Sequence, residues 1–129
     1  MSDPTLRIVF PADAAELRDV RHRIAAWAAP YLSASDVEDL KLAVTEACAN
    51  AVQHSGTQEI RVTISLDGSC VEVVVEDDGV YQMHLSGVAG DPGAHRGLIL
   101  MAAMVDDLSL QRGTEKRTGT RVRLVKCPA

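Results

Sequence analysis

The alternation of hydrophobic and polar residues predicts five strands and three helices along this 129-residue chain. Alternation with a period of two, rich in β-branched residues, is typical of a half-buried strand, whereas apolar positions three and four residues apart indicate an amphipathic helix. The order is strand, helix, helix, strand, strand, long Gly-rich loop, helix, strand, strand. The predicted ranges are 5–10, 13–30, 36–54, 60–66, 71–76, 78–94, 96–105, 108–111 and 120–126.

Capping and turn residues support these boundaries. Asp13 precedes the first helix, and Ser35 with Glu38 three residues later has the spacing of a capping box at the start of the second helix. Asp67-Gly68 is a favoured turn between antiparallel strands. The sequence therefore predicts an α/β (α+β) two-layer sandwich, with three helices on one face of a mixed, mostly antiparallel sheet. We expect a single domain over residues 1–129.

Charge and cysteine content narrow the function classes. The formal net charge of −5 disfavours broad attraction to nucleic acid or to an anionic membrane, so a protein partner or a small ligand is expected. No apolar run approaches the roughly 20 residues of a membrane-spanning helix, and the expected location is the cytoplasm. Because Cys48, Cys70 and Cys127 are odd in number and widely spaced, we expect reduced thiols, with neither a disulfide nor a zinc site.

The second predicted helix carries a polar stripe. Glu46, Asn50 and His54 are four residues apart, so their side chains lie along one side of the helix. Residues 43–55 contain no Lys or Arg. Carboxylate and amide oxygens suit a hydrated Mg²⁺ ion. On this stripe alone, a solvated helix face and a binding site are equally supported.

Two further signals follow in the second half of the chain. A predicted buried strand ends in Asp77, and Gly79 comes two residues later. A carboxylate there could accept a hydrogen bond from an exocyclic amine such as that of adenine, and glycine allows a ring to approach the backbone. An ordinary acidic turn is the alternative, and it is the better supported one on this motif alone. In the final strand, Thr120 could donate to a buried carboxylate or to the base, or be a simple strand former.

The segment Arg96-Gly97-Leu98 is the fourth signal. Here a Gly-containing loop is predicted to enter the third helix, and the free N–H groups at a helix start can bind phosphate. A plain entry turn is the alternative explanation.

Taken in chain order, the four segments resemble the N, G1 and G2 boxes and the terminal strand of the ATPases typified by gyrase, histidine kinases and MutL. The sequences EACANAVQH at residues 46–54 and RGL at residues 96–98 are similar to those of the anti-sigma factor serine kinases of bacterial stress response and sporulation control. The resemblance covers about residues 6–126. It implies a Bergerat-type ATP-binding fold with ATP and Mg²⁺ as cofactors.

The resemblance also implies a role for each site residue. Asn50 would ligate the Mg²⁺ that bridges the ATP phosphates, and Glu46 would be the catalytic base for an incoming serine hydroxyl. Asp77 would hold the adenine amine. The remaining positions expected to contact or support ATP are His54, Gly79, Arg96, Gly97, Leu98 and Thr120.

Three positions depart from the family pattern. Tyr81 stands where the G1 box usually has a second glycine, and His95 and Ile99 stand where the G2 box is usually richer in glycine. The β-branched side chain of Ile99 is expected to crowd the phosphates.

The function implied by the resemblance is partner switching in transcription. The chain would sequester a sigma factor and, with ATP bound, phosphorylate a serine of a small STAS-type anti-sigma factor antagonist, as a homodimer. One alternative is a binding module of the same fold without kinase activity. The other is a detached histidine-kinase-like ATPase domain that serves a phosphorelay.

Overall fold

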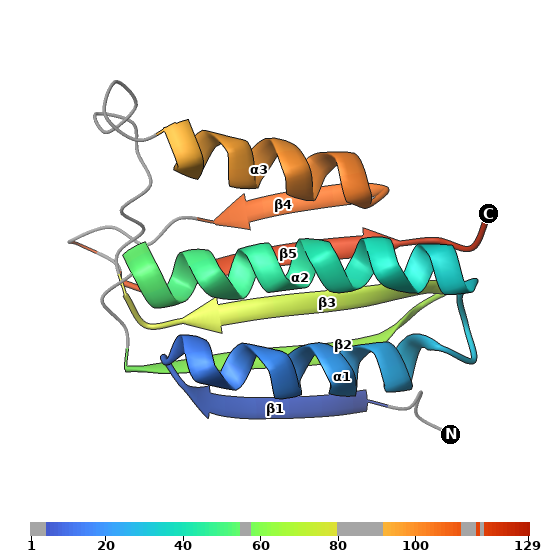
Figure 1. Ribbon diagram of the computed structural model, residues 1–129, viewed down its shortest axis with the longest axis horizontal. Coiled ribbons are helices and arrows are strands. Elements are labelled where there is room, and N and C mark those ends of the chain that lie inside the picture. The colour runs from blue at the N-terminus through green and yellow to red at the C-terminus, as the bar shows by residue number, and fades with distance from the viewer. Residues whose placement is uncertain (1–4, 55–57, 80–91, 112–115, 117) are drawn as a thin grey trace.

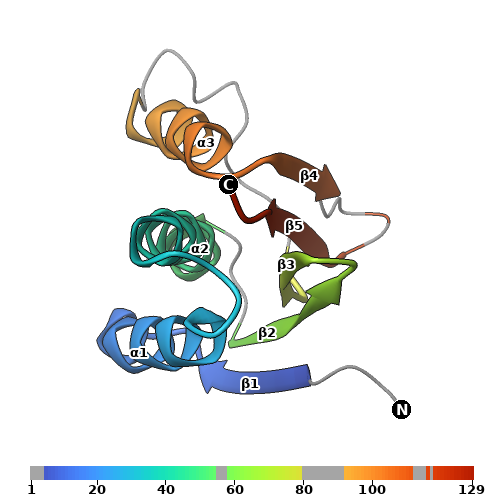
Figure 2. The ribbon, with the colours of Figure 1, turned by 90° about the vertical axis from the view of Figure 1, so that its right-hand side faces the viewer.

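The computed structural model describes residues 5–54, 58–79, 92–111, 116 and 118–129. In this part of the chain the strands form one layer and the helices cover one face of it (Figures 1 and 2). The sheet has the strand order β1-β2-β3-β5-β4. The elements are β1 (Thr5–Pro11), η1 (Ala14–Glu16), α1 (Leu17–Ala28), α2 (Ala34–His54), β2 (Glu59–Asp67), β3 (Cys70–Asp77), α3 (Pro92–Met104), β4 (Asp107–Gln111) and β5 (Thr120–Lys126).

The predicted two-layer fold is confirmed, and the sheet is more uniform than expected. Each of the four ladders between described strands is antiparallel, so the mixed sheet predicted from the sequence is not observed. The Asp67-Gly68 turn joins β2 to β3 as predicted, with Gly68 at a φ of 63°, a conformation that glycine adopts without steric cost. The β3–β5 ladder pairs two segments that lie far apart in the sequence.

The core lies between the helices and the sheet face that they cover. Val73 and Leu124 point from the sheet toward Ile24, Leu40 and Val44 of the helices, and all five are essentially inaccessible to solvent. Burying one such side chain contributes roughly 1.5–3 kcal/mol. Because the described aromatic residues are few, aliphatic packing holds the two layers together.

The helix starts agree with the prediction at one place and differ at another. The Asp13 carboxylate accepts a hydrogen bond from the Ala15 N–H (2.9 Å), as a capping residue should. In α2, however, the cap is Ser33, whose Oγ accepts from the Asp36 N–H (3.1 Å). The predicted cap at Ser35 is wrong because Ser33 offers a similar spacing two residues earlier.

The third helix begins earlier than predicted. It starts at Pro92 rather than at Arg96 or Gly97. Proline is favoured in a first turn because the N–H that it lacks would have no partner there. Gly97 therefore lies inside the helix, and the predicted free N–H groups at this residue are not found.

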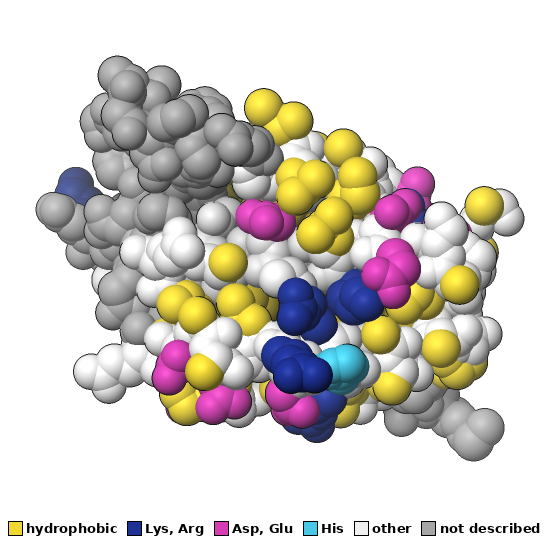
Figure 3. Space-filling model, in the orientation of Figure 1, with side chains coloured by type: hydrophobic (Ala, Val, Ile, Leu, Met, Phe, Trp, Pro, Cys, Tyr) yellow, Lys and Arg dark blue, Asp and Glu magenta, His cyan; other side chains and the backbone are white. Residues whose placement is uncertain are grey.

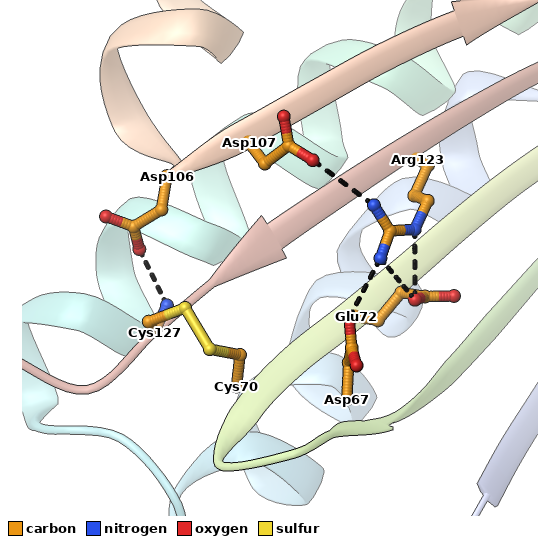
Figure 4. The surroundings of a disulfide bond; sticks show 7 residues. All are labelled: Asp67, Cys70, Glu72, Asp106, Asp107, Arg123 and Cys127. Carbon is orange, nitrogen blue, oxygen red and sulfur yellow. Dashed lines mark hydrogen bonds and ion pairs between the residues drawn. A yellow bond between two sulfur atoms is a disulfide. The ribbon is translucent and has the colours of Figure 1, made fainter.

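Two of the cysteines form a disulfide, contrary to the prediction of reduced thiols. Cys70 and Cys127 are joined, with a Cα–Cα distance of 4.1 Å (Figure 4). Spacing along the chain did not reveal this bond, because it depends on the pairing of β3 with β5, whose last pair is Val71 with Lys126. Cys48 remains a free thiol, and burial raises its pKa to about 12.

An arginine ties the strands together near the disulfide, on the sheet face that carries no helix (Figure 4). Arg123 of β5 contacts Asp67 (2.9 Å), Glu72 (2.9 Å) and Asp107 (3.2 Å). Hydrogen bonding to Glu72, followed by the carboxylate charges, raises the pKa of Arg123 above its ordinary value. The guanidinium thus connects β5 to the β2–β3 hairpin and to β4.

Reduction of the Cys70–Cys127 bond is expected to lower the free energy of unfolding. The bond spans a sequence separation of 57 residues, and closing such a loop in the unfolded chain is estimated to contribute about 4 kcal/mol at most. We expect a loss of about 2–4 kcal/mol in urea denaturation when a reductant is added.

The double variant Cys70→Ser, Cys127→Ser is the control, since its unfolding curve should not respond to reductant. Iodoacetamide should label Cys70 and Cys127 only after reduction, and Cys48 only after unfolding. Identical wild-type curves with and without reductant would contradict the bond.

Candidate functional site

Asn50, Asp77 and Thr120 are the buried polar residues among those that the structure describes. Their exposed fractions are 8%, 4% and 3%. All three line one cavity, although they come from α2, β3 and β5. Three segments that the sequence analysis singled out separately are therefore brought together.

The strand pairing explains the position of Asp77 and Thr120. They are directly opposite each other in the β3–β5 ladder. Successive residues of a strand point to opposite faces, so Asp77 faces the helices while Asp78 is exposed on the other face. There Asp78 pairs with Arg61 (3.1 Å), whose hydrogen bond and charge hold the pKa of the Asp78 carboxyl below its ordinary value. Only the first carboxylate of the pair can serve the cavity.

Gly79 and Gly119 lie close to Asp77 and Thr120 in the chain, where β3 ends and β5 begins. The Gly79 N–H donates to Asp77 Oδ1 (2.8 Å), which orients the carboxylate. The Gly79 carbonyl accepts from the Gly119 N–H (3.0 Å). Gly119 has a φ of 109°, which a side chain would disfavour. A backbone hydrogen bond therefore joins the segment that follows the end of β3 to the residue that precedes β5.

A third glycine allows α3 to pack closely on α2. A Cβ atom added at Gly97 would lie 3.3 Å from Glu46 Oε2 and 3.4 Å from Asn50 Nδ2. A side chain here would push against both polar groups. Gly97 thus lets α3 approach the side of α2 that carries Glu46 and Asn50, which lie one helical turn apart on that helix.

The Asn50 amide is incompletely satisfied. Within the described part of the chain, its Nδ2 atom is buried and has no hydrogen-bond partner. A buried donor without a partner costs about 1–3 kcal/mol, so such groups in native proteins call for an explanation. The amide oxygen of Asn50 and the carboxylate oxygens of Glu46 are ligands of the kind that a hard cation such as Mg²⁺ prefers.

The cavity is narrow. Its volume is about 10 Å³, which is room for about one water molecule and not for a nucleotide base. Leu98 is half-buried and packs against the core. Ile99 is 68% exposed and does not line this cavity.

Other predicted site residues lie only partly within the described structure. His54 ends α2 and Arg96 lies in α3, but their side chains, like that of His95, are outside the described part, as is Tyr81. The alanines of α2, which the sequence marks as small enough for a close approach to the helix, include two that line the cavity, Ala47 and Ala51. The rest of the apolar lining consists of Val75, Met101 and Val122, which the sequence did not single out as site residues.

Comparisons with known proteins show which proteins this chain resembles. The chain is 34% identical over 95 residues to the serine-protein kinase RsbW of Bacillus licheniformis, covering 61% of this chain and 59% of that protein. It is 42% identical over 48 residues to the RsbW of Bacillus thuringiensis, covering 35% and 30%. The chain thus spans about three fifths or less of these relatives.

A solved histidine kinase domain, from the blue-light-activated histidine kinase of Erythrobacter litoralis, has a similar fold. The TM-score is 0.54 at 20% identity, and the match covers 98% of this chain and 68% of that one. Among the described residues, none of the helices combines the length and the hydrophobicity of a membrane-spanning segment. The profile of the histidine kinase-like ATPase domain matches residues 10–126, and the chain therefore belongs to that family.

Proposed function

We propose that this protein is an ATP-dependent serine kinase that acts on a protein partner. The observation that carries the proposal is the convergence of Asn50, Asp77 and Thr120 on one cavity, next to Glu46 at the crossing of α2 and α3. The relatives named serine-protein kinase supply the reaction class. The chain spans only part of the length of these relatives, so kinase activity is proposed here for this chain.

The adenine would bind at the strand end of the cavity. Asp77, oriented by the Gly79 N–H, would accept a hydrogen bond from the adenine amine, with Thr120 beside it and the Gly79 backbone near the ring. A base needs far more room than about 10 Å³. Binding would therefore require the cavity walls to separate.

The phosphates and Mg²⁺ would bind at the helix end. Asn50 would hold the ion through its amide oxygen. Its unpartnered Nδ2–H would then be able to donate a hydrogen bond to a bound group. Arg96 and Gly97 would lie against the phosphates, with Leu98 anchoring α3 to the core and His54 in a supporting role. Bound Mg²⁺ would neutralise phosphate charge during transfer.

Glu46 would act as the general base. Its Oε2 atom lies next to the position of the missing Gly97 side chain, beside Asn50. From there the carboxylate would accept the proton of a serine hydroxyl as that oxygen takes the γ-phosphoryl group of ATP and ADP leaves. The proposed partners are a sigma factor and a STAS-type antagonist carrying the serine, and the proposed assembly is a homodimer in the cytoplasm.

The narrow cavity favours a second candidate function. A binding module of the same fold that holds a partner without nucleotide would need no room for a base, and the observed volume of about 10 Å³ suits that case. ATP binding separates the two functions directly.

Isothermal titration with ATP and Mg²⁺ is expected to give a micromolar to sub-millimolar dissociation constant, which Asn50→Ala abolishes because the ion loses its ligand. Glu46→Ala should retain binding but lose phosphotransfer to the antagonist, because only the proton acceptor is removed. An absence of heat and of thermal shift at millimolar ATP would leave the partner-binding module.

The variant Asn50→Leu is expected to fold at least as well as the wild type while losing ATP binding. Leucine removes the unpartnered Nδ2 donor and fills a similar volume, so the free energy of unfolding should rise or change by less than about 1 kcal/mol in urea denaturation. A loss of more than about 2 kcal/mol would show that the amide stabilises the fold rather than serving a ligand.

A further inference from the structure

The disulfide lies at the end of the sheet opposite the candidate site. Cys70 is the first residue of β3, and Cys127 follows the last residue of β5. The candidate site is at the other end of this ladder, where Asp77 pairs with Thr120. Both cysteines are partly exposed, so small oxidants and reductants can reach the sulfur atoms. We call the region around the bond the disulfide end; it consists of Asp36, Asp39, Cys70, Asp106, Lys126 and Cys127.

The disulfide end fixes the start of α2. Lys126 is the last residue of β5, and its Nζ atom lies 3.5 Å from Asp39 Oδ2 and 3.8 Å from Asp36 Oδ1. The side chains of Lys126 and Asp36 are only 13% and 15% exposed, so salt and water screen this contact weakly. Both aspartates belong to the first two turns of α2. The position of α2 over the sheet therefore depends on where the end of β5 is held.

The disulfide end also fixes the end of α3. The side chains of this helix from Leu98 to Met104 are all apolar, and hydrophobic side chains gather over it in Figure 3. This stretch of α3 therefore has no polar side chain that could tie it to its neighbours. Asp106, two residues beyond the helix, provides the polar anchor. Its N–H donates to the Val125 carbonyl (2.8 Å), and its carboxylate accepts from the Cys127 N–H (2.6 Å; Figure 4).

These contacts affect the cavity because they join the elements that form its walls. Its lining comes from α2 and α3 on one side and from β3 and β5 on the other. Widening the cavity beyond its volume of about 10 Å³ requires the two helices to move away from the two strands. While the bond is intact, residues 125–127 are joined covalently to β3, and both helices are held to these residues.

We propose that the Cys70–Cys127 pair is a redox switch that controls how readily α2 and α3 separate from the sheet. The oxidised pair holds the helices and keeps the cavity narrow. The reduced pair releases the end of β5, so that the contacts of Lys126 and Asp106 open locally at a lower free energy. Disulfides in the cytosol are usually transient, catalytic or redox-sensing, which suits the location proposed above. That the wider cavity admits ATP rests on the proposed function.

The two states interconvert by exchange of two electrons. In the oxidation by hydrogen peroxide, one cysteine sulfur attacks a peroxide oxygen, the O–O bond breaks, and a sulfenic acid and one water molecule form. The second cysteine sulfur then attacks the sulfenic sulfur, so that the S–S bond forms, the S–O bond breaks and a second water molecule leaves. In the reduction, a dithiol attacks the bond through a mixed disulfide and becomes a disulfide itself, and both cysteines regain their protons.

Amide hydrogen exchange followed by NMR tests the switch without nucleotide. The amides of Asp106, Cys127 and the first turn of α2 report on the disulfide end, and those of the β1–β2 ladder report on the rest of the sheet. We expect reduction of the wild type with dithiothreitol to accelerate exchange at the disulfide end about tenfold more than in the β1–β2 ladder. Both sets respond to the lower global stability, so the excess measures the local release.

The oxidised Ile8→Ala variant is the matched control. Ile8 is buried in β1, two strands away from β3, so the substitution lowers the global stability without removing a contact of the disulfide end. Its exchange should accelerate through global unfolding, with no excess at the disulfide end. Lys126→Gln in the oxidised protein should accelerate exchange in the first turn of α2, because the ion pairs with Asp36 and Asp39 are lost while the bond stays intact.

Isothermal titration with ATP and Mg²⁺ tests the consequence for the cavity. The reduced wild type and the double variant Cys70→Ser, Cys127→Ser should bind ATP about tenfold more tightly than the oxidised wild type, because the open conformation is then more populated. Reoxidation with hydrogen peroxide should restore the weaker binding in the wild type and leave the double variant unchanged.

Two results would overturn the proposal. The first is an acceleration of exchange on reduction that shows no excess at the disulfide end, as expected for Ile8→Ala. The second is measurable ATP binding with the same affinity in the oxidised and reduced wild type. An absence of ATP binding in both states would count against the proposed kinase function instead, and the exchange measurement would then decide the switch alone.

Discussion

The antiparallel pairing of β3 with β5 is the constraint on which the rest of the structure depends. It joins two segments about 50 residues apart and fixes both ends of the ladder at once. At one end Asp77 faces Thr120 beneath the helices, and at the other Cys70 meets Cys127. The core strands, the candidate site and the covalent bond all follow from this one register.

The sequence predicted the fold well where periodicity was strong. The ranges of β5 and β4 were placed within one residue, because polar and apolar residues alternate along most of each strand. The starts of α2 and α3 were missed by two and four residues or more. Both begin where more than one residue can cap or open a helix, and the choice between them depends on packing that a local pattern does not contain.

The candidate site was predictable in its members but not in its shape. The polar site residues stood out at predicted helix and strand positions, and the resemblance to a family implied a role for each of them; these are Glu46, Asn50, Asp77 and Thr120. That Gly97 serves a helix crossing, and that the cavity is narrow, depends on distances between elements. The disulfide was missed for the same reason, since only the ladder brings its two cysteines together.

Because Asp77 and Asp78 are adjacent, the carboxylate that reaches the site depends on the register of β3. Asp77 is the last residue of β3 and Asp78 follows it, and their side chains face opposite sides of the sheet. A register slip of one residue would exchange them, turning Asp78 inward and Asp77 toward Arg61. A slip of two residues would preserve the faces but misalign Asp77 with Thr120. The Gly68 turn and the Cys70–Cys127 bond restrain both slips at the far end of the ladder. Among related sequences, single-residue insertions in the β2–β3 hairpin should therefore be rarer than insertions in the loops at the opposite end of these strands.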